Sequence, residues 1–178
     1  PQFFGGQKKD LSDIANLARG RYREGTHVDE WGCVWTNMNE GMDAIVTGHP
    51  VKSPGDVYSL EIPENRDGSL PHGFMYLRIL DLCGFENAMM MFAEEGDEIR
   101  ILIDKVLQYN KYQIDAVIDS FGDIAGFGDD LGMQTGLAIG AERWRKYLKP
   151  CYAELYGMIK KRHPKLPIYM HTDGCIYE

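Results

Sequence analysis

Two short apolar segments in the C-terminal half of the chain each end in a run of polar residues, and this repetition constrains the fold most. The segments are residues 124–127 and residues 166–170. The polar residues that follow them are Asp129 and Asp130 after the first segment, and His171, Thr172 and Asp173 after the second. A buried strand that opens into a polar loop has this profile. We therefore predict two buried strands whose ends carry the chemistry.

Helical patterns precede each of these strands. Apolar residues recur at three- and four-residue spacing from residue 99 to residue 118, which predicts a long helix with one buried face and Asp97 as its N-cap. A second stripe, from residue 141 to residue 162, predicts another helix that Pro150 kinks. Shorter helices are predicted for residues 74–82 and 85–95. Strands that alternate with helices predict parallel βα units, in which sites gather at the carboxyl ends of the strands.

The N-terminal part reads differently. Residues 1–70 are interrupted by glycine and proline, and they predict loops with short strands at 30–35 and 44–47. We therefore divide one α/β domain into an irregular N-terminal segment, 1–70, and βα units over 71–178. A complete eight-fold barrel takes about 250 residues. The chain has 178 residues, so we expect a partial (β/α)8 TIM barrel with parallel strands.

Composition and charge limit the classes of molecule that the chain is expected to bind. The net charge is −8, which disfavours a nucleic-acid surface, since phosphate binding needs clustered Lys and Arg. No apolar run is long enough to span a membrane. The four cysteines are scattered without a CxxC pair, which favours reduced thiols and a cytoplasmic setting. The expected partner is a small-molecule substrate.

The residues after the two strands are the catalytic candidates. His171 can bind a metal or transfer a proton near neutral pH, and Asp173 lies two positions later, on the same side of an extended segment. Zinc accepts both side chains, so these two are also the metal candidates. The alternative for His171 is an ordinary hydrogen bond at a strand end. Asp129 and Asp130 point to opposite faces if the strand continues, so only one of them is expected to face the site. The alternative for them is a solvated turn.

A second group is proposed to bind substrate. His72 lies near the predicted start of the helix over 74–82 and can line the site. Arg78 suits a carboxylate or phosphate, although a surface arginine is the plainer interpretation. Gln134 offers an amide. The remaining candidates are aromatic, with core packing as their alternative; they are Tyr76, Trp31, Trp35 and Tyr22.

Four stretches resemble the uroporphyrinogen decarboxylase family, over most of residues 29–178. They are Asp29-Glu30-Trp31-Gly32-Cys33-Val34-Trp35, Gly84-Phe85-Glu86-Asn87, Phe127-Gly128-Asp129-Asp130-Leu131-Gly132-Met133-Gln134-Thr135-Gly136-Leu137 and His171-Thr172-Asp173-Gly174. The block from Phe127 to Tyr152 is the most specific. Within the superfamily the chain looks more like the corrinoid-linked methyltransferases than the haem-pathway decarboxylase. The decarboxylase differs at the Gly-Asp-Asp strand and carries an arginine-rich N-terminal motif that is absent here.

The resemblance implies a (β/α)8 barrel with the site in its mouth. It implies methyl transfer between a corrinoid, held on a separate corrinoid-binding protein, and a thiol, or demethylation of a methoxylated substrate. Several relatives of this branch bind zinc through His-x-Cys and a later Cys. Here His171 matches the histidine, while Asp173 stands where the first cysteine would be. The alternatives are uroporphyrinogen decarboxylation in porphyrin biosynthesis, and a non-catalytic half-barrel that forms a homodimer through its open sheet edges.

Overall fold

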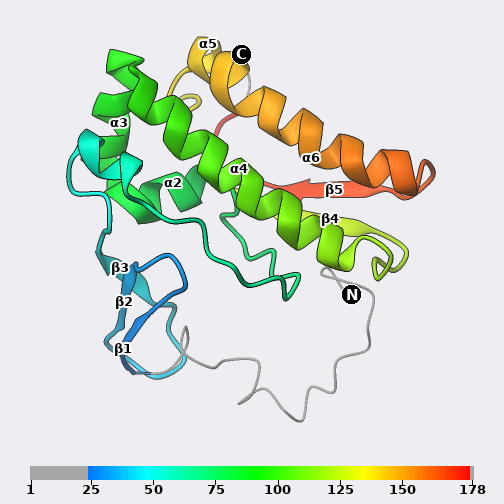
Figure 1. Cartoon of the computed structure of the whole chain (residues 1–178), viewed down its shortest axis with the longest axis horizontal. Coiled ribbons are helices and arrows are strands. Elements are labelled where there is room, and N and C mark those ends of the chain that lie inside the picture. The colour runs from blue at the N-terminus through cyan, green and yellow to red at the C-terminus, as the bar shows by residue number, and fades with distance from the viewer. Residues whose placement is uncertain (1–23, 177–178) are drawn as a thin grey trace.

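A computed structural model describes residues 24–176 of the chain (Figure 1). The structure is a mixed α/β arrangement with a small antiparallel sheet, a group of helices and a parallel pair of strands. In chain order the elements are β1 (Gly25–Val28), β2 (Val34–Asn37), β3 (Ile45–Gly48), the 3₁₀ helix η2 (Pro54–Tyr58), α2 (Tyr76–Cys83), α3 (Phe85–Glu94), α4 (Asp97–Val117), β4 (Ala125–Gly128), α5 (Ala141–Arg143), the π-helical turn η3 (Trp144–Leu148), α6 (Lys149–Arg162) and β5 (Ile168–His171).

The parallel pair confirms the main geometric prediction. β4 and β5 run in the same direction, with Ala125 opposite Ile168 and Gly128 opposite His171. The backbone N–H of Asp129 donates to the carbonyl of His171 at 3.0 Å, which continues the pairing one residue past β4. The two carboxyl ends therefore lie side by side, and the residues that follow them share one edge of the sheet.

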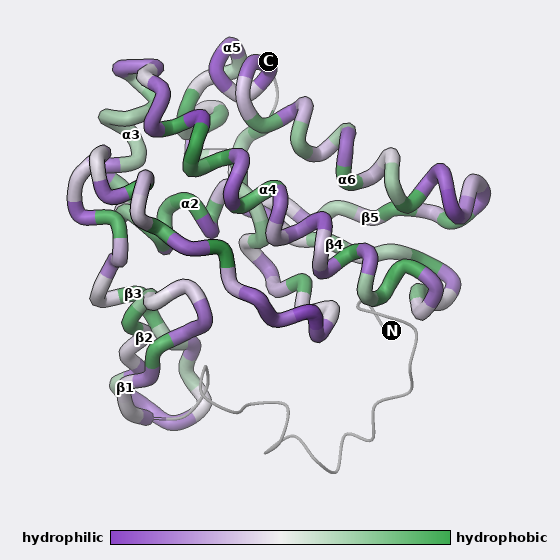
Figure 2. Tube along the Cα trace, in the orientation of Figure 1, coloured by the Kyte–Doolittle hydropathy of each residue, from purple (hydrophilic) through white to green (hydrophobic). Residues whose placement is uncertain are grey.

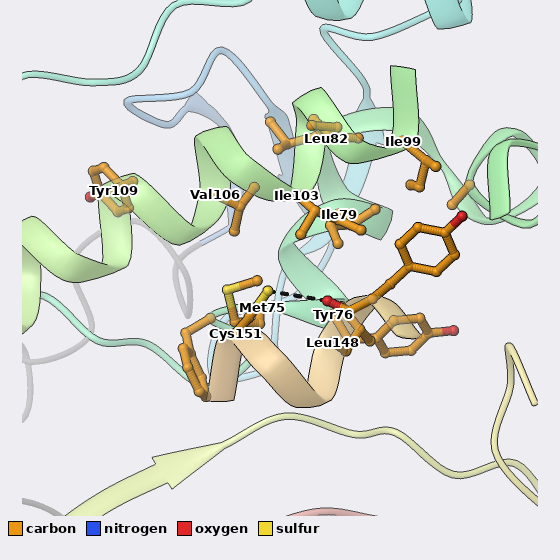
Figure 3. Packing of buried hydrophobic residues seen from close by; sticks show 14 of the residues in the cluster. Met75, Tyr76, Ile79, Leu82, Ile99, Ile103, Val106, Tyr109, Leu148 and Cys151 are labelled. Carbon is orange, nitrogen blue, oxygen red and sulfur yellow. Dashed lines mark hydrogen bonds between the residues drawn. The ribbon is translucent and has the colours of Figure 1, made fainter. Parts of the chain in front are cut away.

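The helices lie together over this pair. Figure 1 shows α4 and α6 running next to each other, and α2, α3 and α4 also contact one another. Hydrophobic and hydrophilic residues alternate along α4 and α6 in Figure 2, as one buried face requires. The hydrophobic core forms where α2, α4 and the η3–α6 segment meet. Figure 3 shows its centre, which includes Met75, Ile79, Leu82, Ile99, Ile103, Val106, Leu148 and Cys151.

Both long helices differ in detail from the sequence predictions. Asp97 is the first residue of α4 rather than its N-cap, because Gly96 occupies the cap position. Asp97 and Glu98 still place two carboxylates in the first turn, where they favour the helix dipole. Residues 141–162 are helical throughout, so Pro150 does not break the helix. The π-helical turn η3 comes just before α6, and Pro150 is the second residue of α6, so the change from π- to α-helical hydrogen bonding lies next to the proline.

Residues 24–70 contain more regular secondary structure than the sequence predicts. The described part of residues 1–70 contains the antiparallel sheet, in the order β1-β2-β3, and η2. The predicted strand over 30–35 is wrong in its first half. Asp29 Oδ1 accepts hydrogen bonds from the backbone N–H groups of Trp31 and Cys33, at 3.0 and 2.8 Å, and folds those residues into a turn. The strand therefore begins at Val34, and β1 before the turn was not predicted.

No helix between residues 24 and 176 has the combined length and apolar character that a membrane crossing requires.

Candidate functional site

The carboxyl ends of β4 and β5 bring three ionisable side chains together. One donor atom each from Asp130, His171 and Asp173 lies within 4.8 Å of the other two. His171 Nε2 and Asp173 Oδ1 are 3.3 Å apart. The Asp173 side chain is 73% exposed and that of His171 is 40% exposed, so a molecule from solvent can reach the group. We call these three residues the strand-end cluster.

His72 contacts the strand-end cluster from the start of the α2 segment. Its Nε2 lies 3.0 Å from Asp130 Oδ2. The imidazole rings of His72 and His171 are 5.5 Å apart between centroids. His72 is therefore placed at the edge of the site, where the sequence suggested that it can line the mouth.

The loops after the two strands are held tightly against each other. Asp130 Oδ1 accepts a hydrogen bond from the backbone N–H of Asp173 at 3.0 Å. A Cβ added to Gly132 would lie 2.6 Å from the backbone of Gly174, and a Cβ on Gly174 would lie 2.2 Å from the Gly132 carbonyl oxygen. Since Gly174 also has a φ of 82°, glycine is required there twice over. This contact fixes the distance between Asp130 and Asp173.

Asp129 has the opposite orientation and is fully buried. Its carboxylate accepts hydrogen bonds from the backbone N–H groups at the start of α2 and from the Tyr152 hydroxyl of α6. The donors are Met75 (3.1 Å), Tyr76 (2.6 Å), Leu77 (2.9 Å) and Tyr152 (2.6 Å). Burial raises the pKa of the Asp129 carboxyl above its usual range, and these hydrogen bonds oppose that effect. As expected for neighbours on a strand, only one of the two aspartates, Asp130, faces the site.

The carboxylate of Asp129 explains how α2 begins. The first N–H groups of a helix have no partner within the helix, and the positive end of its dipole favours an anion. Asp129 supplies the acceptors for these N–H groups. Burial and the neighbouring Asp129 carboxylate raise the pKa of the Tyr152 hydroxyl well above its usual range, so the hydroxyl stays a donor.

Two of the other proposed substrate-binding residues, Arg78 and Trp31, are buried. Arg78 is buried, and its guanidinium pairs with Asp29 at 2.7 Å and with Asp81 at 3.8 Å, so it is neither a surface arginine nor a free anion receptor. Trp31 is buried edge-on against Tyr109, with ring centroids 5.1 Å apart.

The remaining candidates divide between core and surface. Tyr76 is buried in the core, which raises the pKa of its hydroxyl to about 12. Gln134 is exposed in the loop after β4. Trp35 donates through Nε1 to Asp29 Oδ2 at 2.9 Å, and Tyr22 lies outside the described residues.

Sequence reasoning missed the network around Asp29. This carboxylate joins the turn at residues 29–33, the Trp35 indole and the Arg78 guanidinium. A pocket of about 280 Å³ lies beside it, and His72 is part of its wall. The other lining residues are His27, Asp29, Glu30, Trp35, Ser69, Pro71, Arg78 and Asp81. Asp29 and Arg78 are 49 positions apart, so no local sequence pattern predicts their pairing.

Comparisons with known proteins identify the family. Residues 80–177 match the family described as uroporphyrinogen decarboxylase (URO-D), which is more than half of the chain. No curated protein and no solved structure gives a significant match. The matched region contains β4, β5 and the whole strand-end cluster, which is consistent with an enzyme of the superfamily that includes decarboxylases and methyltransferases. The chain therefore belongs to the uroporphyrinogen decarboxylase family.

Proposed function

We propose that the chain is a corrinoid-linked methyltransferase, of the methylcobamide methyltransferase or O-demethylase type, with its reaction centre at the strand-end cluster. The observation that carries the proposal is the convergence of Asp130, His171 and Asp173 at the carboxyl ends of two parallel strands. Enzymes with parallel α/β folds place their sites at this edge. The exposure of His171 and Asp173 suits a substrate and a corrinoid that arrives on a separate protein.

A divalent metal ion such as zinc fits the cluster by the chemistry of its donors. The three residues offer one imidazole nitrogen and two carboxylates, and zinc accepts this set. A bound ion would act as a Lewis acid on the oxygen or sulfur that exchanges the methyl group. The donor set lacks the thiolates of the related zinc enzymes, which favours a harder ion or a looser zinc site than theirs.

In this proposal the chain's own side chains hold and orient the reacting groups. His171 and Asp173 bind the ion or the substrate at the open side of the cluster. Asp130 lies between His72 Nε2 and the Asp173 N–H, which restricts its rotation. Preorganised groups of this kind lower the cost of reaching the reactive geometry.

Charge argues against the rival reaction, decarboxylation of a porphyrinogen. That substrate carries many carboxylates and calls for arginines at the site. Arg78, which lines the same pocket as His72, is already paired with two aspartates.

We further propose that β4 and β5 are neighbouring strands of a (β/α)8 barrel of which the described residues form a part. Their parallel pairing supports this, as does the family, whose fold is a TIM barrel. Open edges beside the two strands would then pair with further strands of the barrel or, in a homodimer, with a second copy. All four cysteines are free thiols, which supports a cytoplasmic setting.

The proposal is tested by methyl transfer from methylcobalamin to a small thiol, followed by the absorbance change of the corrinoid and with the bound metal quantified in the same preparation. The expected result is turnover that His171→Ala abolishes. Turnover at the wild-type rate in His171→Ala would remove His171 from the reaction. Uroporphyrinogen is assayed in parallel, and release of CO₂ without methyl transfer would assign the chain to the decarboxylases.

Solution mass tests the non-catalytic alternative. A dimer that depends on concentration, with neither activity, would favour a half-barrel binding module over an enzyme.

A further inference from the structure

The last residue of β4, Gly128, lies against the imidazole ring of His72. We propose that Gly128 and Asp129 are positioning residues, which place the His72 imidazole against Asp130 and thereby fix the orientation of the Asp130 carboxylate. The role of Asp130 rests on the proposed function. The placement of His72 does not, and it can be measured separately.

Gly128 provides the space for the ring. A Cβ at Gly128 would lie 2.2 Å from His72 Nδ1 and 3.0 Å from its Cε1, far inside contact distance. The backbone of Gly128 is not in the left-handed region that favours glycine. The glycine is therefore required by the neighbouring imidazole rather than by its own conformation.

Asp129 and the carbonyl of Gly128 hold the segment that carries His72. Gly73, the next residue, donates its backbone N–H to the Gly128 carbonyl at 2.7 Å. The buried carboxylate of Asp129 then accepts the N–H groups of Met75, Tyr76 and Leu77. These bonds leave the main chain after His72 little freedom to move relative to β4.

The result is that Asp130 is restrained on both oxygens. Oδ2 lies 3.0 Å from His72 Nε2, and Oδ1 accepts the Asp173 N–H at 3.0 Å. Partners that orient a ligating carboxylate typically contribute about 10–100-fold to metal affinity. His72 is such a partner in this site, and Gly128 is the residue that admits it.

Gly128→Ala is the sharpest variant, because it changes one methyl group and no charge. The matched control is Gly136→Ala, in the loop after the same strand, where an added Cβ meets no atom within 4 Å. Two readouts are used: the ¹⁵N resonances of the His72 imidazole in histidine-labelled protein, and the dissociation constant of Co²⁺ alone. We expect Gly128→Ala to shift the His72 resonances and to weaken Co²⁺ binding about tenfold. Gly136→Ala should change neither.

The double variant Gly128→Ala/His72→Ala tests whether Gly128 is needed to make room for the His72 ring or for another reason. If the ring is what Gly128 accommodates, His72→Ala should restore most of the stability that Gly128→Ala loses, while Co²⁺ affinity stays at the level of His72→Ala. His72→Gln keeps a side-chain donor near Asp130 and should recover part of the Co²⁺ affinity that His72→Ala loses. Asp129→Asn should shift the His72 resonances if the protein still folds.

Unchanged His72 resonances in Gly128→Ala would overturn the proposal. So would a stability loss in Gly128→Ala that His72→Ala does not relieve, or equal Co²⁺ affinity in His72→Ala and the wild type. A wild-type chain that binds no Co²⁺, but whose His72 resonances respond to Gly128→Ala, would support the placement of His72 and count against the metal in the proposed function.

Discussion

The structure contains two groups of carboxylates that differ in what their oxygens contact. The inner group, Asp29 and Asp129, is surrounded by donors. Asp29 receives backbone N–H groups, an indole and a guanidinium, and Asp129 receives three backbone N–H groups and a tyrosine hydroxyl. The outer group, Asp130 and Asp173, faces solvent and histidine rings.

The contacts of a carboxylate, rather than its residue type, predict whether it stabilises the fold or is available to bind a ligand. A carboxylate whose oxygens are all occupied inside the protein holds elements together, and its loss leaves buried donors without partners. A carboxylate that keeps an open side can bind a metal or a substrate. The inner group should therefore control folding stability, and the outer group should control binding and activity.

The largest effect on stability is expected at Asp129. Asp129→Asn replaces an acceptor with an amide that points N–H groups at the N–H groups of α2. The free energy of unfolding should fall by about 4 kcal/mol, as measured by urea denaturation. The matched control is Asp123→Asn, an exposed carboxyl just before β4, which should change it little. Equal losses in the two variants would contradict the role given to Asp129.

The next largest effect is expected at Arg78. Arg78→Met leaves Asp29 and Asp81 without their shared cation, and breaking a buried pair should lower the free energy of unfolding by about 3 kcal/mol. Arg162→Met is the matched control, because Arg162 pairs with Asp119 through two bonds of 2.7 and 2.8 Å at an exposed position. Exposed pairs contribute little, so thermal unfolding should separate the two variants clearly.

A smaller effect is expected at Tyr152. Tyr152→Phe removes one hydrogen bond to the buried Asp129 carboxylate and should cost about 1.5 kcal/mol. One turn along α6, the buried hydroxyl of Tyr156 has no hydrogen-bond partner among the described residues, so Tyr156→Phe should leave stability unchanged or raise it slightly. Chemical denaturation of both variants measures the difference. A larger loss of stability in Tyr156→Phe than in Tyr152→Phe would contradict the stabilising role given to the hydrogen bond between Tyr152 and Asp129.

The smallest effect on stability is expected in the strand-end cluster. His171→Ala should change the free energy of unfolding by no more than about 0.5 kcal/mol, because the side chain is 40% exposed. A loss comparable with that of Asp129→Asn would show that His171 is structural.

Sequence patterns predicted the parts of this account that depend on local order. Apolar periodicity located α4 and both parallel strands, because each element buries one face or both. The position of polar residues at or directly after the ends of β4 and β5 indicated that Asp130, His171 and Asp173 lie close together, since parallel strands end at the same edge.

Other features depend on contacts between distant segments, which no pattern in one segment reveals. The strand alternation showed that Asp129 and Asp130 diverge, but the start of α2 decides which one is buried, and α2 lies more than 50 positions away. Arg78 was expected either to bind an anionic substrate or to lie on the surface, because its partner Asp29 was not recognised. The turn at residues 29–33 was taken for strand because its aromatic content resembles one, while the Asp29 side chain folds it back.

The central claim is that the ends of β4 and β5 form one working centre from Asp130, His171 and Asp173. Calorimetric titration of Zn²⁺ into the wild-type chain and into Asp130→Asn, His171→Ala and Asp173→Asn tests it most directly, with folding verified for each variant. The account predicts one site per chain in the wild type and at least about tenfold weaker binding in each variant. Binding at wild-type strength in all three variants, or no binding in the wild type, would contradict it.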